Sequence, residues 1–295
     1  MRRLRAATRG SPLARWQVGH VVALVAAADP EVTVELVVVE TTGDRRLDVP
    51  IWDLGGKGVF AKEVQAAVLD GRADLAVHSA KDLLSVMVPG LVIAAVPERG
   101  DPRDALVGST LADLPEGAEV ATGSLRRQVE LWRHRPDLRF VSLRGNMHTR
   151  IAKAADHDAV VVAATALDRL GLADQIAERL STGTVLPQVA QAALAVECRE
   201  DDDDLRALLQ VVQHGPTRRR VDAERAFLAE LGGDCSLPAG AHAVIDGDQL
   251  RLHAFLSSPD GRTMLRFDSG GRDASVGTRV ARHLLDNGGT ELLGR

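Results

Sequence analysis

Short apolar runs alternate with amphipathic stretches along the first two thirds of this chain. Apolar and β-branched residues gather at 4–8, 32–39, 74–78 and 91–96, which predicts four strands. Ser11 followed by Pro12 predicts a helix to about residue 28, with serine as its cap and proline in its first turn. A second helix is expected from about 61 to 69, after a long polar loop at 41–57. This alternation predicts α/β sheets that carry ligand loops at their strand ends.

The alternation resumes after Asp101-Pro-Arg-Asp104, which we interpret as a crossover into a second unit. Strands are expected near 119–121, 139–143 and 159–163, and helices from about 125, 148 and 165. Residues 189–197 are expected to return toward the first unit, and the acidic run 200–204 to begin a helix. A helix at 216–231, three strands with turns at 246–248 and 259–261, and a helix at 274–287 predict a small C-terminal α+β domain.

Composition and charge narrow the class of protein. The chain has 295 residues, 45% of them hydrophobic and 26% charged, which suits a soluble protein of two or three domains. Its net charge of −5 argues against a general nucleic-acid binder, because that function needs a broad basic surface. No apolar run approaches the ~18–20 residues that span a bilayer, and no secretion signal follows the basic N-terminus. We therefore expect a cytoplasmic protein without membrane or nucleic-acid partners, and a monomer because no surplus apolar stripe demands a partner.

The two cysteines, Cys198 and Cys235, are too few for a disulfide framework. The nine histidines lack the paired spacing of a zinc site, so no metal is expected. Cys198 ends an apolar run and is expected to be buried and inert. Cys235 lies in a polar, glycine-containing segment, which makes it the candidate for an exposed thiol.

Polar residues cluster where predicted strands end. In Val77-His-Ser-Ala-Lys-Asp82 the strand is followed by Ser79, Lys81 and Asp82. A carboxylate fixed there can stabilise a developing cation or pass a proton. The alternative is a helix-capping Asp82 beside a solvent-facing lysine, and His78 is more often a satisfied strand-end histidine than a base.

A glycine-rich loop, Gly55-Gly-Lys-Gly-Val-Phe60, precedes a predicted helix and contains Lys57. Backbone N–H groups in such a loop can meet an anion. The loop lacks the Ser or Thr that follows lysine in nucleotide hydrolases, and a plain turn is an equally good interpretation.

Seven arginines and no lysine lie between Gly123 and Arg150. Four of them form two clusters near predicted helix entrances, Arg126 with Arg127 and Arg144 with Arg150. Guanidinium groups held at such places can bind several carboxylates or phosphates at once. Because the chain has only four lysines and uses arginine as its default cation, the other three arginines are expected to be surface charges.

Nine short strings in this sequence occur in the order of one known family. They are Ala7-Thr-Arg-Gly-Ser-Pro-Leu-Ala, Gly55-Gly-Lys-Gly-Val-Phe, Val77-His-Ser-Ala-Lys-Asp, Glu98-Arg-Gly-Asp-Pro-Arg-Asp-Ala, Ser124-Leu-Arg-Arg-Gln, Leu143-Arg-Gly-Asn, Thr149-Arg150, Leu194-Ala-Val-Glu-Cys-Arg and Ala223-Glu-Arg-Ala-Phe-Leu. Each string is modest alone, but the ordered set is specific. Over nearly its whole length the chain resembles the porphobilinogen deaminase family.

The resemblance implies a transferase, hydroxymethylbilane synthase, that condenses four porphobilinogen molecules head to tail and releases ammonia at each step. The family carries a dipyrromethane cofactor, joined by a thioether to a cysteine that corresponds to Cys235. The linear product is finally hydrolysed from the retained cofactor. The family's catalytic aspartate matches Asp82, which is expected to stabilise positive charge on the pyrrole nitrogens and to assist proton transfer.

The resemblance also gives the arginines a purpose, because every pyrrole ring bears an acetate and a propionate. The residues that match carboxylate-binding positions are Arg9, Arg126, Arg127, Arg144, Arg150 and Arg169. Those that match the supporting polar shell are Ser11, Lys57, Ser79, Lys81, Thr122 and Ser124, and Phe60 matches a residue that stacks near the incoming ring.

The family fold implies three domains. Domain 1 would comprise 1–97 with 190–214, domain 2 would comprise 98–189, and domain 3 would comprise 215–295. The first two are α/β domains similar to type II periplasmic binding proteins, with the active site between them. The third is a small α+β domain that carries the cofactor cysteine on a loop.

The chain departs from the family pattern at two places that bear on structure. Ala190-Gln-Ala stands where the family has Gly-Gln-Gly, and alanine tolerates positive φ poorly, so a hinge there is expected to be stiffened or altered. Gly123 stands where the family has a serine, which leaves the carboxylate shell one hydroxyl short.

Two alternatives are weighed against the enzyme. A non-catalytic binding module would share the two-lobed fold but would have no need of a covalently loaded thiol. A degenerate homologue that binds tetrapyrrole precursors without turnover would have lost Asp82 or Cys235, and both are present.

Overall fold

The structure is a computed structural model that describes residues 2–45, 58–233 and 237–294. By its internal contacts the chain divides into two compact units. The first comprises Met1–Gly100 with Ala192–Arg218, and the second comprises Asp101–Gln191 with Arg219–Arg295. Both units are mixed α/β structures, as the sequence predicts.

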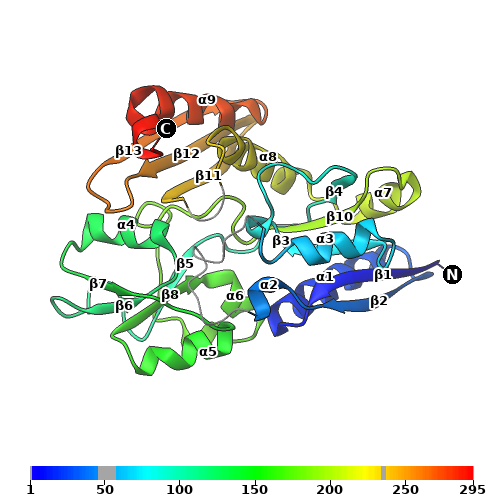
Figure 1. Ribbon diagram of the computed structural model, residues 1–295, viewed down its shortest axis with the longest axis horizontal. Coiled ribbons are helices and arrows are strands. Elements are labelled where there is room, and N and C mark those ends of the chain that lie inside the picture. The colour runs from blue at the N-terminus through cyan, green and yellow to red at the C-terminus, as the bar shows by residue number, and fades with distance from the viewer. Residues whose placement is uncertain (1, 46–57, 234–236, 295) are drawn as a thin grey trace. The chain divides into compact units, whose positions relative to one another are not determined.

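A five-stranded mixed sheet with the order β2-β1-β3-β10-β4 forms the centre of the first unit (Figure 1). Its strands are β1 (Arg2–Arg9), β2 (Val32–Val39), β3 (Leu75–Ser79), β4 (Leu91–Ala95) and β10 (Leu194–Arg199). β1 is parallel to β2 and β3, whereas β10 is antiparallel to β3 and β4. All four strands predicted before residue 97 are confirmed, and β10 confirms the predicted return of the chain.

The helices of the first unit begin close to their predicted positions. They are α1 (Pro12–Ala28), α2 (Thr42–Arg45), α3 (Lys62–Leu69), α7 (Asp203–Leu209) and the short 3-10 turns η2 (Ala80–Asp82) and η5 (Gln210–Val212). Ser11 caps α1 by accepting a hydrogen bond from the Ala14 N–H at 3.2 Å. The predicted polar loop at 41–57 is wrong at its start, because the Thr42 N–H and hydroxyl both donate to Glu63, at 2.9 and 2.6 Å, where α2 begins.

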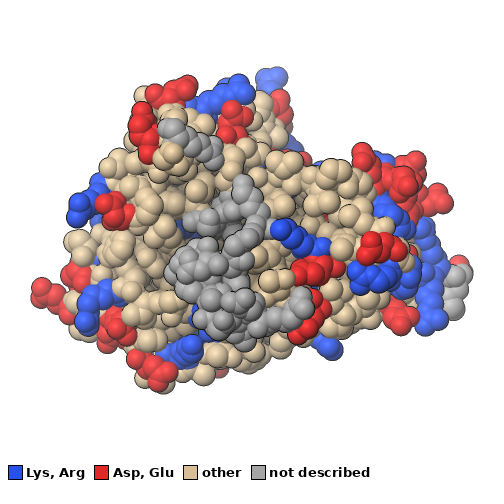
Figure 2. All heavy atoms as spheres, in the orientation of Figure 1, with Lys and Arg blue, Asp and Glu red and all other residues tan. Residues whose placement is uncertain are grey.

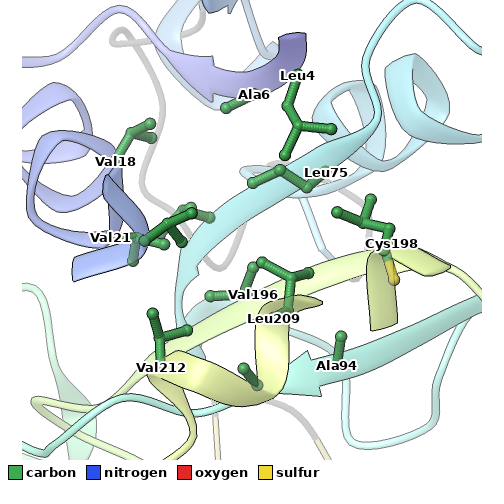
Figure 3. Packing of buried hydrophobic residues seen from close by; sticks show 14 of the residues in the cluster. Leu4, Ala6, Val18, Val21, Leu75, Ala94, Val196, Cys198, Leu209 and Val212 are labelled. Carbon is green, nitrogen blue, oxygen red and sulfur yellow. The ribbon is translucent and has the colours of Figure 1, made fainter. Parts of the chain in front are cut away.

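Helices α1 and α3 cover opposite faces of this sheet. Leu4 of β1 packs in the cluster that contains Val18 of α1, whereas Ala7 packs in the cluster that contains Val64 of α3. Side chains alternate between faces along a strand, so β1 supplies both layers. Figure 3 shows the cluster on the α1 side, which includes the Cys198 thiol. Cys198 is confirmed as buried, and burial raises its pKa to about 11, which makes the thiolate scarce.

The second unit contains two sheets (Figure 1). The first has the order β7-β6-β8-β5-β9, and its strands are β5 (Asp104–Val107), β6 (Glu119–Ala121), β7 (Arg139–Val141), β8 (Ala159–Ala163) and β9 (Glu178–Arg179). The second is antiparallel, and its strands are β11 (Ala239–Asp246), β12 (Gln249–Ser257) and β13 (Met264–Gly271). The sequence missed β5 and β9 because strands of four and two residues show no clear periodicity.

The helices of the second unit support these sheets. They are α4 (Leu125–His134), α5 (Met147–Ala152), α6 (Ala164–Arg169), α9 (Ser275–Leu284), α10 (Thr290–Leu292), the turns η3 (Lys153–Ala155), η4 (Ala173–Gln175) and η6 (Leu285–Gly289), and α8 (Gly215–Glu230), which crosses the boundary between the units. Gly277 lets α9 approach α8 closely, since a Cβ there would overlap the Ala223 carbonyl. Val129, Leu186 and Phe255 form one core cluster that joins α4 to the C-terminal sheet. The division into three domains stays a prediction.

The chain passes from the second unit to the first through two strained residues. Ala190 and Ala192 have φ values of 57° and 70°, the left-handed region that favours glycine. Surrounding bonds hold them there: the Ala190 N–H donates to Glu224 at 2.7 Å, and the Ala192 carbonyl accepts from the Gly100 N–H at 3.3 Å. The backbone thus keeps a glycine-type conformation although alanine occupies both positions.

None of the described helices is both long enough and apolar enough to cross a membrane. On the face of the molecule shown in Figure 2, acidic and basic side chains are interspersed.

Candidate functional site

A small polar cavity of about 60 Å³ lies in the first unit where β1 and β3 end. Its polar lining consists of Arg9, Ser11, Gln17, His78, Ser79 and Asp82, and Phe60 forms part of its apolar wall. Because β1 and β3 are parallel, their carboxyl ends meet at one edge of the sheet, which is where α/β folds bind ligands. The structure therefore brings together five of the residues expected from the sequence: Arg9, Ser11, Phe60, Ser79 and Asp82.

Arg9 is the last residue of β1, and its guanidinium lies over the Phe60 ring, 4.3 Å from the ring centroid. A cation over an aromatic face is attracted by the electrons of the ring. A Cβ at Gly43 would overlap the same ring, so a larger residue there would displace Phe60. Phe60 thus contacts Arg9 directly, and its expected stacking on a substrate ring stays a prediction.

Asp82 ends the 3-10 turn that follows β3 and is half-buried at the cavity. The Ala80 N–H fixes this turn by donating to the Ala193 carbonyl at 3.0 Å. No described helix begins directly after Asp82, which removes the alternative that it caps one. Lys81 lies in the same turn and is half-buried.

The sequence missed Gln17 as a member of this site. Its side chain is 3% exposed, and its Nε2 donates to the Ser79 hydroxyl at 2.8 Å. A polar residue among Ala14, Val18 and Val21, on the buried face of α1, is the signal that could have found it.

In the second unit, Arg126 and Arg127 point into the protein interior. They are 3% and 7% exposed, and both bind the fully buried carboxylate of Asp104. The Nη2 atoms of Arg126 and Arg127 lie 2.7 and 2.8 Å from its two oxygens. Arg126 also donates to the Leu186 carbonyl at 2.6 Å, and Arg127 to the Val161 carbonyl at 3.1 Å.

Asp104 is ionised in this environment. Burial alone would raise its pKa, but the two guanidinium groups hold the pKa well below its usual range. Gln191 adds a third contact, because its Nε2 donates to Asp104 at 2.9 Å. A carboxylate of the chain itself therefore occupies the inner side of the first arginine cluster. That Arg126 and Arg127 bind ligand carboxylates stays a prediction.

The remaining expected residues of the second unit lie at or after the ends of its strands. Thr122 and Ser124 precede α4, and the Ser124 N–H donates to the Thr122 hydroxyl at 3.3 Å. Arg150 of α5 donates through Nε to the Gly145 carbonyl at 2.8 Å. Arg144 precedes the same helix. Burial lowers the pKa of Arg169, in α6, to about 10.

Of the three arginines expected to be surface charges, Arg133 and Arg139 are exposed, which confirms that expectation. Arg135 is partly exposed, with 23% of its side chain accessible. Its guanidinium binds Asp137 at 2.7 Å and the carbonyls of Leu111 and Leu114 at 3.1 Å each, so it supports a loop. Two further expected site residues, Lys57 and Cys235, lie outside the described residues.

The cavity of the first unit combines a guanidinium, hydroxyl groups and a carboxylate at the carboxyl edge of an α/β sheet. Such a set defines a protein that binds a small molecule carrying both anionic groups and hydrogen-bond donors.

Comparisons with known proteins identify the family. Residues 4–207 match the family model "Porphobilinogen deaminase, dipyromethane cofactor binding domain", and residues 218–286 match "Porphobilinogen deaminase, C-terminal domain". The porphobilinogen deaminase of Syntrophus aciditrophicus is 47% identical over 294 residues, which are 97% of this chain and 96% of that protein. The enzyme of Syntrophomonas wolfei is 44% identical over 304 residues, covering 99% and 98% of the two chains. The chain belongs to the porphobilinogen deaminase family.

Two solved structures of binding proteins are similar to part of this chain. The methionine-binding protein MetQ is 13% identical with a TM-score of 0.44, covering 73% of this chain and 92% of its own. A nutrient-binding protein from Burkholderia cenocepacia bound to methionine is 14% identical with a TM-score of 0.44, covering 77% of this chain and 95% of its own.

Proposed function

We propose that this chain is a transferase that condenses four porphobilinogen molecules head to tail, releases ammonia at each step and yields hydroxymethylbilane for tetrapyrrole biosynthesis. The observation that carries the proposal is the cavity of the first unit, where Arg9 and Asp82 line one small polar space. Porphobilinogen carries carboxylates, a pyrrole N–H and an aminomethyl group, so it needs both a cation and an acceptor. Membership of the family over nearly the whole chain supports the same reaction.

Asp82 is the proposed catalytic residue. When ammonia departs, positive charge moves onto the pyrrole nitrogen, and a nearby carboxylate stabilises that charge more than it stabilises the bound substrate. The half-buried position of Asp82 at a protein-lined cavity favours this role, because charges interact more strongly away from bulk water. The same oxygens can accept the proton lost after the new bond forms.

The cationic and hydroxyl residues are proposed to hold the carboxylates of the pyrrole rings. In the first unit these residues are Arg9, Ser11, Lys57, Ser79 and Lys81, with Phe60 beside the incoming ring. In the second unit they are Thr122, Ser124, Arg126, Arg127, Arg144, Arg150 and Arg169. For Arg126 and Arg127 we propose mainly an indirect contribution, because Asp104 already binds both guanidinium groups and thereby fixes the start of α4.

Cys235 is the proposed attachment point of the dipyrromethane. The family model that matches residues 4–207 is that of the cofactor-binding domain, and the mixed cation and hydroxyl lining of the cavity suits a group that carries carboxylates. When bound, the group would supply the first acceptor for chain growth. The thiol of Cys198 is no alternative attachment point, since it is buried in the hydrophobic core.

Mass spectrometry and a product assay test this proposal together. The intact protein should exceed its sequence mass by one dipyrromethane, and Cys235→Ser should lack the increment and the activity. Cys198→Ser is the matched control and should keep both. Purified protein that carries the increment but releases no ammonia from porphobilinogen would contradict the enzyme and favour a binding homologue. The expectations of a monomer, of a cytoplasmic location and of no membrane or nucleic-acid partner stay predictions.

A further inference from the structure

Three buried polar side chains lie behind the cavity, and the proposed reaction assigns none of them a role. Gln65 comes from α3, His78 from β3 and Glu197 from β10. The Glu197 side chain is fully buried and the His78 side chain is 5% exposed. Burial of a carboxylate is costly unless partners compensate its lost hydration. His78 also lines the cavity, so this buried group reaches the place where a ligand would bind.

The contacts around Glu197 determine where its neighbours carry protons. Gln65 Nε2 donates to both carboxylate oxygens at 3.0 Å. His78 Nε2 lies 2.9 Å from Oε2 of Glu197, which is within ion-pair distance, although the two atoms do not form a hydrogen bond by geometry. Two lone pairs at this distance would repel, so a proton lies between them. Because Glu197 already accepts the amide N–H groups of Gln65, we place that proton on His78 Nε2.

This arrangement leaves Nδ1 as the ring nitrogen of His78 that can accept a hydrogen bond. In a neutral imidazole one nitrogen donates and the other accepts, and the partner of the first sets the role of the second. The two acceptors at the end of β3 then differ in kind. Asp82 offers carboxylate oxygens, whereas His78 offers a single ring nitrogen as acceptor.

We propose that His78 contacts the substrate, accepting a hydrogen bond at Nδ1 from a pyrrole or ammonium N–H, and that Glu197 is the positioning residue that fixes its tautomer. The cavity of about 60 Å³ is too small for a whole porphobilinogen but can receive one N–H-bearing end of it. This inference rests on the proposed function, since it names a further contact of the same site.

Two substitutions of His78 separate this role from a structural one. Glutamine can still donate to Glu197 but places no acceptor near Nδ1, whereas the amide oxygen of asparagine lies near the Nδ1 position. His78→Gln should lower kcat/KM by about tenfold or more, the effect of losing one hydrogen bond to a charged or polarised group, and His78→Asn should recover part of the loss. His157→Gln is the control, because His157 lies 2.8 Å from Glu119 in a partly exposed pair that does not line the cavity, and its activity should equal that of the wild type.

The tautomer is measurable without any activity. In ¹⁵N-histidine spectra of the wild-type protein, with His78 assigned by its loss in His78→Asn, Nε2 should be protonated and Nδ1 should not. Glu197→Gln should weaken this preference and lower kcat/KM in parallel. A wild-type ring protonated on Nδ1 alone overturns the proposal, even where a variant fails to fold.

The outcomes also separate this inference from the proposed function. Wild-type protein that releases no ammonia from porphobilinogen would contradict the proposed enzymatic activity. The ¹⁵N spectrum of the same sample would still show which nitrogen of His78 is protonated. An active wild type with unchanged kcat/KM in His78→Gln contradicts the role of His78 alone. Equal losses in His78→Gln and His78→Asn, with lowered thermal stability in both, would indicate a packing role and overturn the substrate contact.

Discussion

Arginines near a strand end have different surroundings in the two units. In each, cationic residues follow a strand and lie near the entrance of a helix. In the first unit the Arg9 guanidinium lies over Phe60 and lines a cavity. In the second, Arg126 and Arg127 turn inward and share the buried carboxylate of Asp104.

In the second unit the chain itself supplies the carboxylate that binds these arginines. Asp104 is the first residue of β5, and it binds α4 although it lies more than twenty residues earlier in the chain. Its ionised carboxylate neutralises the two guanidinium groups in the first turn of α4. In the first unit, the carboxylate next to Lys81, in the turn η2 after β3, is Asp82, which lies at the cavity. Arg9 therefore lines a cavity in the first unit, whereas Arg126 and Arg127 bind a carboxylate of the chain itself in the second.

Removing the internal counterion should give the largest effect. Asp104→Asn keeps the side-chain shape but removes the carboxylate that both buried guanidinium groups bind, so the free energy of unfolding should fall by about 3–5 kcal/mol. Chemical denaturation of the purified variant measures this. Asp137→Asn is the control, because its partner Arg135 is partly exposed, and its loss should be much smaller. Equal losses in the two variants would remove the distinction between the units.

Removing the carboxylate at the cavity should affect activity instead of stability. Asp82→Ala should slow ammonia release by about 100-fold or more, since it removes charge stabilisation and proton transfer together. The melting temperature should stay near that of the wild type because Asp82 is only half-buried. Asp70→Ala, which alters an exposed pair with Arg72, is the control and should stay fully active.

Acid should weaken the second unit through Asp104. Its folded-state pKa lies below the ordinary value of about 3.9, so its stabilisation is complete above pH ~4 and is lost as the pH falls toward the folded-state pKa. The wild type should therefore lose up to about 1.4 kcal/mol per pH unit from this group below pH ~4. Denaturation curves at several acidic pH values should be less steeply pH-dependent for Asp104→Asn. Identical slopes would show that this carboxylate does not titrate as its surroundings require.

The smallest expected change concerns the segment that links the two units. Ala190→Gly and Ala192→Gly should each raise the free energy of unfolding by about 1 kcal/mol, because glycine adopts their positive φ without strain. Ala193→Gly is the control: this neighbour is buried without a positive φ, and the same substitution should destabilise the protein. Lower melting temperatures in all three variants would contradict the strain at 190 and 192.

The fold could be predicted best where a regular pattern of apolar residues extends over many positions. The seventeen-residue α1 has the predicted bounds because the cap at Ser11, the first-turn Pro12 and the buried stripe from Ala14 to Val25 all indicate the same helix. The hairpins of β11–β13 follow from alternating residues and glycine turns. β5 escaped prediction because a four-residue strand becomes stable only through its neighbour β8.

The candidate site was predicted unevenly for a related reason. Arg9, Ser79 and Asp82 were found because each lies at or just after the end of a strand, and a strand end is visible in the sequence. Gln17 and Glu197 were not found because each lies inside a regular element, where only the packing of α1 or α3 on the sheet brings it near the site.

The family, most of the strands and helices and the candidate chemistry follow from the sequence alone, because these depend on local patterns and on residue identities. The folded structure is needed to show which cations line a cavity and which bind Asp104, and which nitrogen of His78 lies next to Glu197. Such choices depend on partners that are distant along the chain, and the cost of burying an unpaired charge enforces them only once the chain has folded.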